Sequence, residues 1–506
     1  MFMKKNDNTN LTQKLCILLL IVALLSVVFM CFSEGISGND FWWHVKTGKW
    51  IVENKAVPTT DIFSWIGTKR GISWTAHEWL SDVIFYCLHS TFGDIGIFIL
   101  SIVAALSMIF LLFFQCRKYI EKNFLVGGLF LGLFSVLTSL FFYGRPHIFS
   151  YFLFFWELRI LYEFVENQKS KKIFFIPFIA MLWSNLHGGS SNLSYILCLI
   201  VLFSGLFNID YERVFSERFD RKSLEKLLIV TFASVVGIMV NPIGFDVLAY
   251  PYVNLNDNLS MSFISEWQSP DAKIIGNLIL YFLPMLLMTI GILCREKKIR
   301  VVDLLIMFSF MFLFFRSVRF IILWYIAAAF YAFRYIPELK VKKIEKKTEK
   351  ITVILMFFLL ILPFCIGVSE MIQTYKDGTI ITKTVSNKAI EIVKEDAPVR
   401  IFNDYNLGEA LIYHDIQVFF DSRADLYAQE NIMADGISLM TLEPVSKSQQ
   451  KSHIDVEAMI EKYRFDAILI LKGRALYSYI VNNSERFALV YEDNELGYFR
   501  VLEKNN

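Results

Sequence analysis

The stretch GNDFWWHVKTGKW, residues 38–50, brings together side chains that can carry out acid–base chemistry. Its acid, Asp40, stands a few residues past an apolar run of the chain, and Trp43 and His44 follow closely. A carboxylate held near a membrane surface can take the proton of an attacking hydroxyl group. We therefore interpret Asp40 as a catalytic base, and Trp43 and His44 as substrate-binding residues. The alternative is that Asp40 caps a helix or forms an interfacial turn.

A second acid follows in WTAHEWL, residues 74–80. Glu78, flanked by His77 and Trp79, can assist Asp40, bind hydroxyl groups of a substrate or join a metal site. The alternative is an acid in the first turn of a helix, where the helix dipole favours negative charge. The sequence leaves both interpretations of Glu78 open, and we take His77 as a substrate-binding candidate.

Two short segments supply positive charge. YGRPH contains Arg145 and His147, and FRSVRF contains Arg316 and Arg319, which we expect on one face of a helix. An arginine fork suits phosphate oxygens, so these residues are candidates for binding a phosphate. The alternative is that the charges only extend from a membrane boundary into water.

A divalent metal ion is also compatible with these residue types. No two candidate ligands have a tight spacing such as HxxxH, so the sequence leaves the metal unknown. His187 in SNLHGGSSN and Glu266 in SEWQSP complete the substrate-binding candidates. The possible ligands are His44, His77, His147, His187, Asp40, Glu78 and Glu266.

The composition points to a membrane protein. Of the 506 residues, 55% are hydrophobic, and the mean hydropathy is +0.47, so lipid must cover part of the apolar surface. The net charge of +2 comes with no basic stripe typical of nucleic-acid binding. The seven cysteines lie in or beside apolar runs without CxxC spacing, which favours reduced apolar residues over disulfides or a zinc site.

Apolar runs near the spanning length recur along the chain and predict about eleven transmembrane helices. We interpret the first run as a retained helix, because no small-residue cleavage pattern follows it. The runs lie near residues 15–32, 94–115, 124–142, 147–165, 173–185, 192–208, 227–241, 277–294, 301–315, 320–335 and 351–368.

The connections alternate in charge. One set, with the N-terminus, holds roughly 25 Lys and Arg and the other roughly 9, which places the N-terminus in the cytoplasm. An odd number of spans then places the chain after residue 368 outside. All the candidate site residues fall on this outer side, in segments rich in Trp, His, Gly and Pro. Structured loops of that kind often shape a binding site.

We expect two domains. Residues 1–368 form a transmembrane domain, with a long outer loop at about 33–93 whose segments KTGKWIVEN and HEWLSDVIFYCLHSTF read as interfacial amphipathic helices. Residues 369–506 alternate strand-like and helix-like patterns, which predicts a small extracytoplasmic α/β domain that folds alone. Its expected strands are VRIFNDY, QVFFDSR, DAILIL and a final hairpin turning at Asp493 and Asn494.

These residues resemble those of the GT-C superfamily of membrane glycosyltransferases. The motifs DFWWHVKTG, HEWL, NLHGG, NP and EW are similar, over most of the chain, to those of a large set of uncharacterised bacterial GT-C-like proteins. The opening quarter distantly resembles the oligosaccharyltransferase catalytic subunit and the protein O-mannosyltransferases, which carry an acid in this loop. Phe41 replaces the proline that follows the acid in the former, and no WWDYG-type motif occurs. The resemblance therefore extends to Asp40 but not to an acceptor pocket.

The resemblance implies transfer of a sugar from a polyprenyl-phosphate donor to an envelope glycan, lipid or protein acceptor at the outer face of the cell membrane. Membrane lipid is the other partner implied. A polysaccharide or lipid-linked sugar transporter or flippase remains an alternative, for which Glu157 and Arg159 within the fourth span are the sequence indication. A non-catalytic envelope assembly protein is a third class. The sequence does not identify the sugar, the acceptor or the linkage.

The charge alternation makes a topological prediction. Green fluorescent protein fused after Asn506 should stay dark, because it does not become fluorescent when exported unfolded, whereas a fusion after Glu345 in a basic loop should fluoresce. Whole-cell fluorescence at matched expression measures both. A bright fusion after Asn506 would place the candidate site residues on the cytoplasmic side.

Overall fold

A computed structural model describes residues 21, 40–120, 124–254, 258–295, 297–336, 385–428, 431–445 and 454–503. The chain divides into two compact units. We call residues 94–248 and 265–336 the helical unit, and residues 40–93, 249–264 and 385–503 the loop–sheet unit. The sequence-based boundary at 368 and 369 lies outside the described residues.

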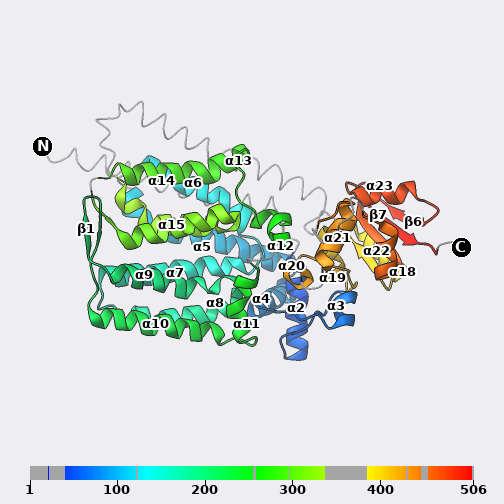
Figure 1. Cartoon of the computed structure of the whole chain (residues 1–506), viewed down its shortest axis with the longest axis horizontal. Helices are drawn as coiled ribbons and strands as arrows, with labels where there is room; N and C mark the ends of the chain where they lie inside the picture. The colour runs from blue at the N-terminus through cyan, green and yellow to red at the C-terminus, as the bar shows by residue number, and fades with distance from the viewer. Residues whose placement is uncertain are drawn as a thin grey trace. The chain divides into compact units, whose positions relative to one another are not determined.

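The helical unit consists of apolar helices that run side by side (Figure 1). The longest, α5, has Asp94 in its first turn and Arg117 and Lys118 in its last, which matches the signs of the helix dipole. The helices are α5 (Asp94–Ile120), α6 (Phe124–Phe141), α7 (His147–Glu166), α8 (Ile176–Ser191), α9 (Leu193–Gly205), α10 (Arg221–Met239), α14 (Leu283–Leu293), α15 (Val301–Arg316) and α16 (Ile321–Tyr331). Short helical turns extend three of these helices. Helix α8 is preceded by η1 (Lys172–Phe175), and α14 by α13 and η3 (Ile275–Phe282). Helix α16 is preceded by η4 (Val318–Phe320) and followed by η5 (Phe333–Tyr335).

Each expected span within the described residues coincides with one of these helices. Four are long and apolar enough to cross a membrane by themselves: Asp94–Ile120, Lys172–Ser191, Ile275–Leu293 and Val318–Tyr335. These four helices indicate a helical membrane protein. The first and last expected spans, 15–32 and 351–368, lie outside the described residues, apart from Ile21.

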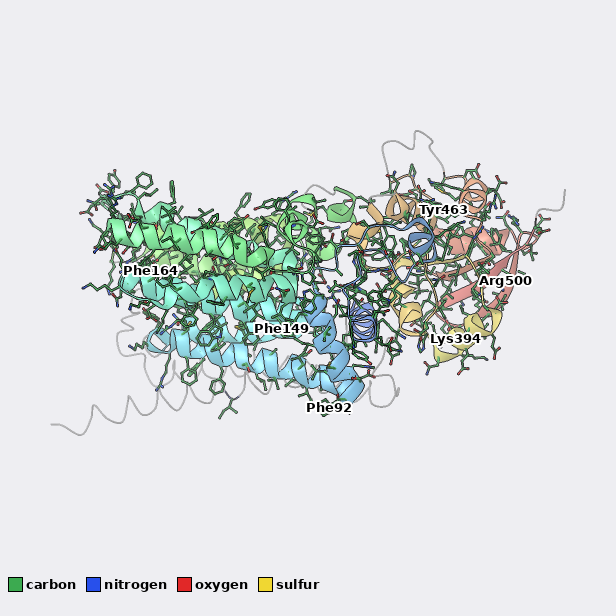
Figure 2. The ribbon with its side chains drawn as sticks, turned by 90° about the horizontal axis from the view of Figure 1, so that it is seen from below. Phe92, Phe149, Phe164, Lys394, Tyr463 and Arg500 are labelled. Carbon is green, nitrogen blue, oxygen red and sulfur yellow. The ribbon has the colours of Figure 1, made fainter. Side chains whose placement is uncertain are left out.

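The basic connections of the helical unit meet at one end of the bundle. Strands β1 (Ile209–Tyr211) and β2 (Val214–Ser216) form a hairpin, and β3 (Ile299–Arg300) pairs in parallel with β2. Glu166 accepts from Arg300 at 2.6 Å and from Arg334 at 3.1 Å. Four segments that are separate in the sequence are therefore joined by pairing and charge. Figure 2 labels Phe164 near this end of α7 and Phe149 toward the other.

The loop–sheet unit contains a four-stranded mixed sheet. Its order is β4-β5-β7-β6, with β4 and β5 parallel and the other neighbours antiparallel. The strands are β4 (Ile401–Asn403), β5 (Ala467–Leu471), β6 (Phe487–Glu492) and β7 (Leu496–Val501). The accompanying helices are α18 (Asn387–Asp396), α19 (Gly408–Tyr413), α20 (Ala424–Ala428), α21 (Ile432–Thr441), α22 (Val456–Tyr463) and α23 (Ala475–Asn482).

One expected strand is wrong. QVFFDSR forms no strand, because Val418 makes only an isolated parallel bridge with Ser64. Phe419 and Phe420 on either side of the backbone are both buried, as a strand inside a core would also require. The apolar pattern therefore predicted correctly that these phenylalanines are buried, but it predicted wrongly that their backbone pairs as a strand.

The first outer loop belongs to the same core as the sheet. Trp43, Trp65 and Trp74 are buried in one hydrophobic cluster with Phe402 and Phe419. This differs from the expectation that residues 369–506 fold alone, because large aromatic side chains of the loop complete the core, and burying each contributes about 1.5–3 kcal/mol. The loop forms α2 (Phe41–Asn54), α3 (Trp65–Arg70) and α4 (Trp79–Phe92), and α12 (Asn258–Phe263) also joins this unit.

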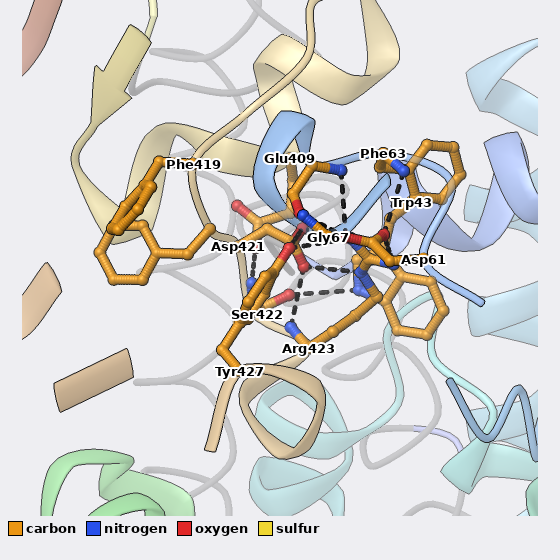
Figure 3. Close-up of polar contacts among 12 residues, drawn as sticks. Trp43, Asp61, Phe63, Gly67, Glu409, Phe419, Asp421, Ser422, Arg423 and Tyr427 are labelled. Atoms are coloured by element: carbon orange, nitrogen blue, oxygen red, sulfur yellow. Dashed lines mark hydrogen bonds and ion pairs between the residues drawn. The ribbon is translucent and has the colours of Figure 1, made fainter. Parts of the chain in front are cut away.

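A buried charge network connects the loop to the C-terminal region (Figure 3). Arg423 donates to both carboxylate oxygens of Asp421, at 2.8 and 2.6 Å, and to Asp61 Oδ1 at 2.8 Å. Its guanidinium lies 4.7 Å from the ring centre of Trp74. Tyr427 donates to Asp421 Oδ2 at 2.5 Å. Since two acids and one base are all buried, each needs the others for compensation.

This network predicts a large and specific loss of stability. Asp61→Asn should lower the free energy of unfolding by about 3–5 kcal/mol, because it leaves the buried Arg423 charge short of one partner. Asp415→Asn is the matched control, since Asp415 is 79% exposed and pairs with Lys46 at the surface, where such pairs contribute under about 1 kcal/mol. Tryptophan-fluorescence melts of the two variants measure the difference. Equal losses would contradict the role assigned to the network.

Candidate functional site

The loop–sheet unit holds an acid–histidine cluster, which we define as His44, His77, Glu78 and Asp82. His44 Nδ1 lies 2.6 Å from Asp82 Oδ1, and His44 Nε2 lies 3.8 Å from Glu78 Oε2. His77 Nε2 lies 3.6 Å from the other oxygen of Glu78. Two carboxyl groups and two imidazoles therefore alternate along one chain of contacts, which is an arrangement that can hold and move a proton.

Helix packing positions this cluster. Glu78 precedes α4 and Asp82 lies one turn further, so both face the same side of the helix. Gly48 of α2 allows the close approach, because a Cβ there would lie 2.0 Å from the carbonyl oxygen of Asp82. The indole of Trp43 lies 3.6 Å from the His44 ring, centre to centre, and holds it from the other side.

Two of the four side chains in the acid–histidine cluster are almost completely buried. His44 is 2% exposed and Asp82 1%. Burial, and then the charge of Glu78, raise the pKa of Asp82 well above its ordinary value. Within the described part of the chain, Asp82 Oδ2 has no hydrogen-bond partner. The short contact between Asp82 and His44 therefore joins a carboxyl group of raised proton affinity to an imidazole ring.

Asp40, at the start of α2, interacts electrostatically with a second carboxyl group, that of Glu409 in α19. Asp40 is half-buried and precedes the helix, but its side chain makes no capping hydrogen bond. Its charge acts on Glu409 of α19, whose pKa is raised to about 8 by burial first, then by Asp421 and Asp40. Glu409 Oε1 accepts from the Ser422 amide at 2.8 Å, whereas Oε2 has no partner among the described residues. Glu409 thus keeps a proton at neutral pH beside Asp40.

The helical unit carries a second group, the arginine–glutamate cluster of Tyr143, Arg145, His147, Glu266 and Arg319. Glu266 accepts from Arg145 at 2.8 and 3.0 Å and from Tyr143 at 2.9 Å. Burial alone would raise the pKa of Glu266, but the charges of Arg145, Arg319 and His147 lower it to about 2. Two arginines therefore surround one firmly ionised carboxylate.

Arg316 and Arg319 do not share a helix face, so that expectation is wrong. Helix α15 ends at Arg316, and Ser317 has an extended backbone with ψ of 129°. Arg316 is exposed, whereas Arg319 follows in the next short turn and lies over the Trp267 ring at 5.3 Å. The break in the helix turns the two side chains apart.

His187 lies in a separate polar group of the helical unit. Its backbone departs from helical geometry inside α8, with φ of −156° and ψ of 76°. Its Nδ1 lies 2.6 Å from Ser150 Oγ and 2.8 Å from Ser190 Oγ. Trp183 Nε1 donates to the same two hydroxyl groups. These contacts satisfy the polar groups at a helix kink, so a structural role accounts for them.

The predicted site residues thus fall into four groups in two units, and Arg316 lies outside all four. Sequence reasoning missed Asp82 and Glu409. Asp82 has a sequence signal, since it stands four residues after Glu78 in an amphipathic segment. Glu409 has none, because its position beside Asp40 depends on residues far apart in the chain. Over the described ranges, no group of three His, Cys, Asp or Glu residues is arranged to hold a metal ion.

Comparisons with known proteins do not assign the chain to a family: no family model matches it, and no curated protein is detectably similar to it. The fold and the site define its class, a helical membrane protein with a compact loop–sheet unit that holds buried acid–base groups.

Glu409 predicts a pH dependence of stability. Its pKa rises from 4.5 to about 8 on folding, so between these values the folded protein binds a proton that the unfolded chain has released. The free energy of unfolding should therefore fall as pH rises through this window and level off above it. Glu409→Gln should remove this fall, whereas Glu391→Gln, at an exposed position of α18, should retain it. Melts of the wild type and both variants from about pH 5 to about pH 9 show whether the free energy of unfolding falls or rises with pH.

Proposed function

We propose that this protein is an integral-membrane glycosyltransferase that moves a sugar from a polyprenyl-phosphate donor to a cell-envelope acceptor. In this proposal about eleven helices span the membrane, and the loop–sheet unit is outside the cell. The observation that supports it best is the pairing of Asp40 with Glu409. Two interacting carboxyl groups, of which one has a strongly raised proton affinity, are typical of acid–base sites.

The chemistry follows from that pair. Asp40 takes the proton of the acceptor hydroxyl group as its oxygen bonds to the anomeric carbon of the sugar. The bond from that carbon to the phosphate oxygen breaks, and polyprenyl phosphate leaves with the electron pair. Because Glu409 holds a proton at neutral pH, it adds no second negative charge beside Asp40. In this proposal Asp40 is the group that accepts the proton during transfer.

The acid–histidine cluster supports the same reaction from α2 and α4. His44 lies on α2, the helix that Asp40 precedes, and Glu78 stands at the start of α4, which packs against α2. Asp82 fixes the orientation of the His44 ring. Glu78 and His77 are less buried than His44, with 12% and 13% of their side chains exposed. We assign them to binding hydroxyl groups of the acceptor or the sugar, for which paired acid and imidazole groups are suited.

Considered by itself, the arginine–glutamate cluster of the helical unit is a candidate anion site, and a phosphate group is an anion that it suits. With Glu266 ionised, Arg145 and Arg319 leave the cluster with one excess positive charge. An arginine that already contacts one carboxylate retains N–H groups for another anion. Arg145, at the start of α7, is the stronger candidate, since Glu266 and the ring of Tyr143, 4.9 Å away, fix its guanidinium.

A transporter or flippase for a lipid-linked sugar is the second candidate. Glu157 favours it, because this acid is completely buried in the middle of α7. Intramembrane acids commonly mark paths for ions or substrates. The transferase differs in requiring Asp40, whereas a flippase needs no base in the loop–sheet unit.

The proposal predicts that Asp40→Asn lowers sugar transfer by at least about 100-fold, since the amide keeps the shape but cannot accept a proton. Asp415→Asn, an exposed acid of the same unit, should transfer normally. Trp43→Ala should lower stability and leave a measurable rate, because Trp43 packs on His44 and donates to Ser422. The assay follows transfer from extracted polyprenyl-phosphate sugars to envelope material.

A strain that lacks the protein provides a second test of the proposed function. Loss of the protein should cause a lipid-linked sugar to accumulate, and the wild-type and Asp415→Asn chains should clear it. If Asp40→Asn also clears it at a normal rate, the catalytic role of Asp40 is wrong and Glu78 becomes the next residue to test. If no lipid-linked sugar accumulates, the donor class is wrong.

A further inference from the structure

Glu157 is an acid enclosed by the helical unit. It lies at the middle of α7, and its side chain is 0% exposed. The neighbouring residues on the same helix, Phe154, Leu158 and Leu161, belong to the hydrophobic core. Helix α7 packs against α8, α9 and α16, so apolar helices surround the carboxyl group on several sides.

Within the part of the chain that the structure describes, no cation pairs with this acid. Cys198 Sγ lies 4.0 Å from Glu157 Oε1, and the Ser194 side chain, also on α9, lies close to the carboxyl group without a hydrogen bond to it. Oε2 has no hydrogen-bond partner within the described residues. The nearest arginine in sequence, Arg159, donates instead to Gln115 at 2.9 Å on α5.

An ionised carboxylate in these surroundings would be costly. Placing an unpaired charge in an apolar interior costs several kcal/mol even after relaxation. A protonated carboxyl group is neutral and has one O–H to donate. Among the described residues, Cys198 is the titratable group that interacts with Glu157, and it is a neutral thiol in an apolar site.

We propose that Glu157 is a proton-binding site inside the helical unit, with the proton held on its carboxyl group and Ser194 and Cys198 as its polar neighbours. Cys198 in turn interacts with Thr231 of α10, so polar side chains from α7, α9 and α10 meet at this place. Loss of the proton would put a charge between these helices, which couples their packing to protonation. This site does not depend on the proposed sugar transfer.

Carbodiimide labelling of the purified full-length protein in lipid tests the site. The hydrophobic reagent dicyclohexylcarbodiimide reacts with protonated carboxyl groups in apolar surroundings, so the peptide containing Glu157 should gain the adduct. Glu163 is the matched control on the same helix, since it pairs with Lys172 at 2.8 Å near the helix end. Glu157→Gln should abolish the adduct and Glu163→Gln should leave it unchanged.

Infrared spectroscopy provides a measurement that needs no reagent access. The difference between wild-type protein and Glu157→Gln should contain the carbonyl stretch of a protonated carboxylic acid. A carboxylate band in that difference would overturn the proposal. Protection of Glu157 from the reagent by sodium ions at constant pH would also overturn it, because a metal cation would then occupy the site. Melting of Glu157→Gln near the wild-type temperature shows that the comparison is between folded proteins.

Discussion

The buried guanidinium of Arg423 is the interaction on which the loop–sheet unit depends. It is held between Asp61 of the first loop and Asp421 of the C-terminal region, and both acids are completely enclosed. A buried charge without its partners is far more costly than the pair is favourable. The two segments must therefore fold together, and the tryptophans of the loop fill the same core. Helices α2 and α4 are supported by this core, and with them Asp40 and the acid–histidine cluster.

The buried acids of this protein differ in whether a positive charge lies beside them. Asp61 and Asp421 have the full positive charge of Arg423 beside them. Asp82 has an imidazole at 2.6 Å, and Glu409 has an amide but no cation in contact, so burial dominates and their pKa values rise. Glu266, with Arg145 and Arg319 nearby, has a lowered pKa despite its burial. The presence of a cation therefore decides which acids are poised to exchange protons.

In the helical unit, the charged residues at helix ends have different surroundings from the acid in mid-helix. Basic connections meet at one end, where Glu166 binds Arg300 and Arg334. Glu266 and Arg145 lie in connections at the ends of other helices, and Ser317 Oγ donates to the Glu266 carbonyl oxygen at 2.9 Å. Glu157 alone of these acids sits in mid-helix. Polar groups at helix ends can reach water or each other, whereas one in mid-helix must remain neutral or be paired.

The sequence by itself determined the positions of the helices and which of the connections between them are basic. Apolar runs and Lys-rich connections are local signals, and each expected span within the described residues is a helix. It also located Asp40, His44, His77 and Glu78, and it predicted β4, β5 and the final hairpin from short apolar runs bounded by turns. These features depend on residues within a few turns of one another, which is why periodicity and spacing suffice.

Only the tertiary structure decided which distant segments share a core. Asp61 and Arg423 are 362 residues apart, and no local pattern indicates that they meet. The same holds for Glu409 beside Asp40 and for Trp65 in the core of the sheet. The break at Ser317, which separates Arg316 from Arg319, depends on Val318 donating to the Gln268 carbonyl oxygen from a distant connection. Hydrophobic patterns report that a residue is buried, but its partner is chosen by the packing of the whole chain.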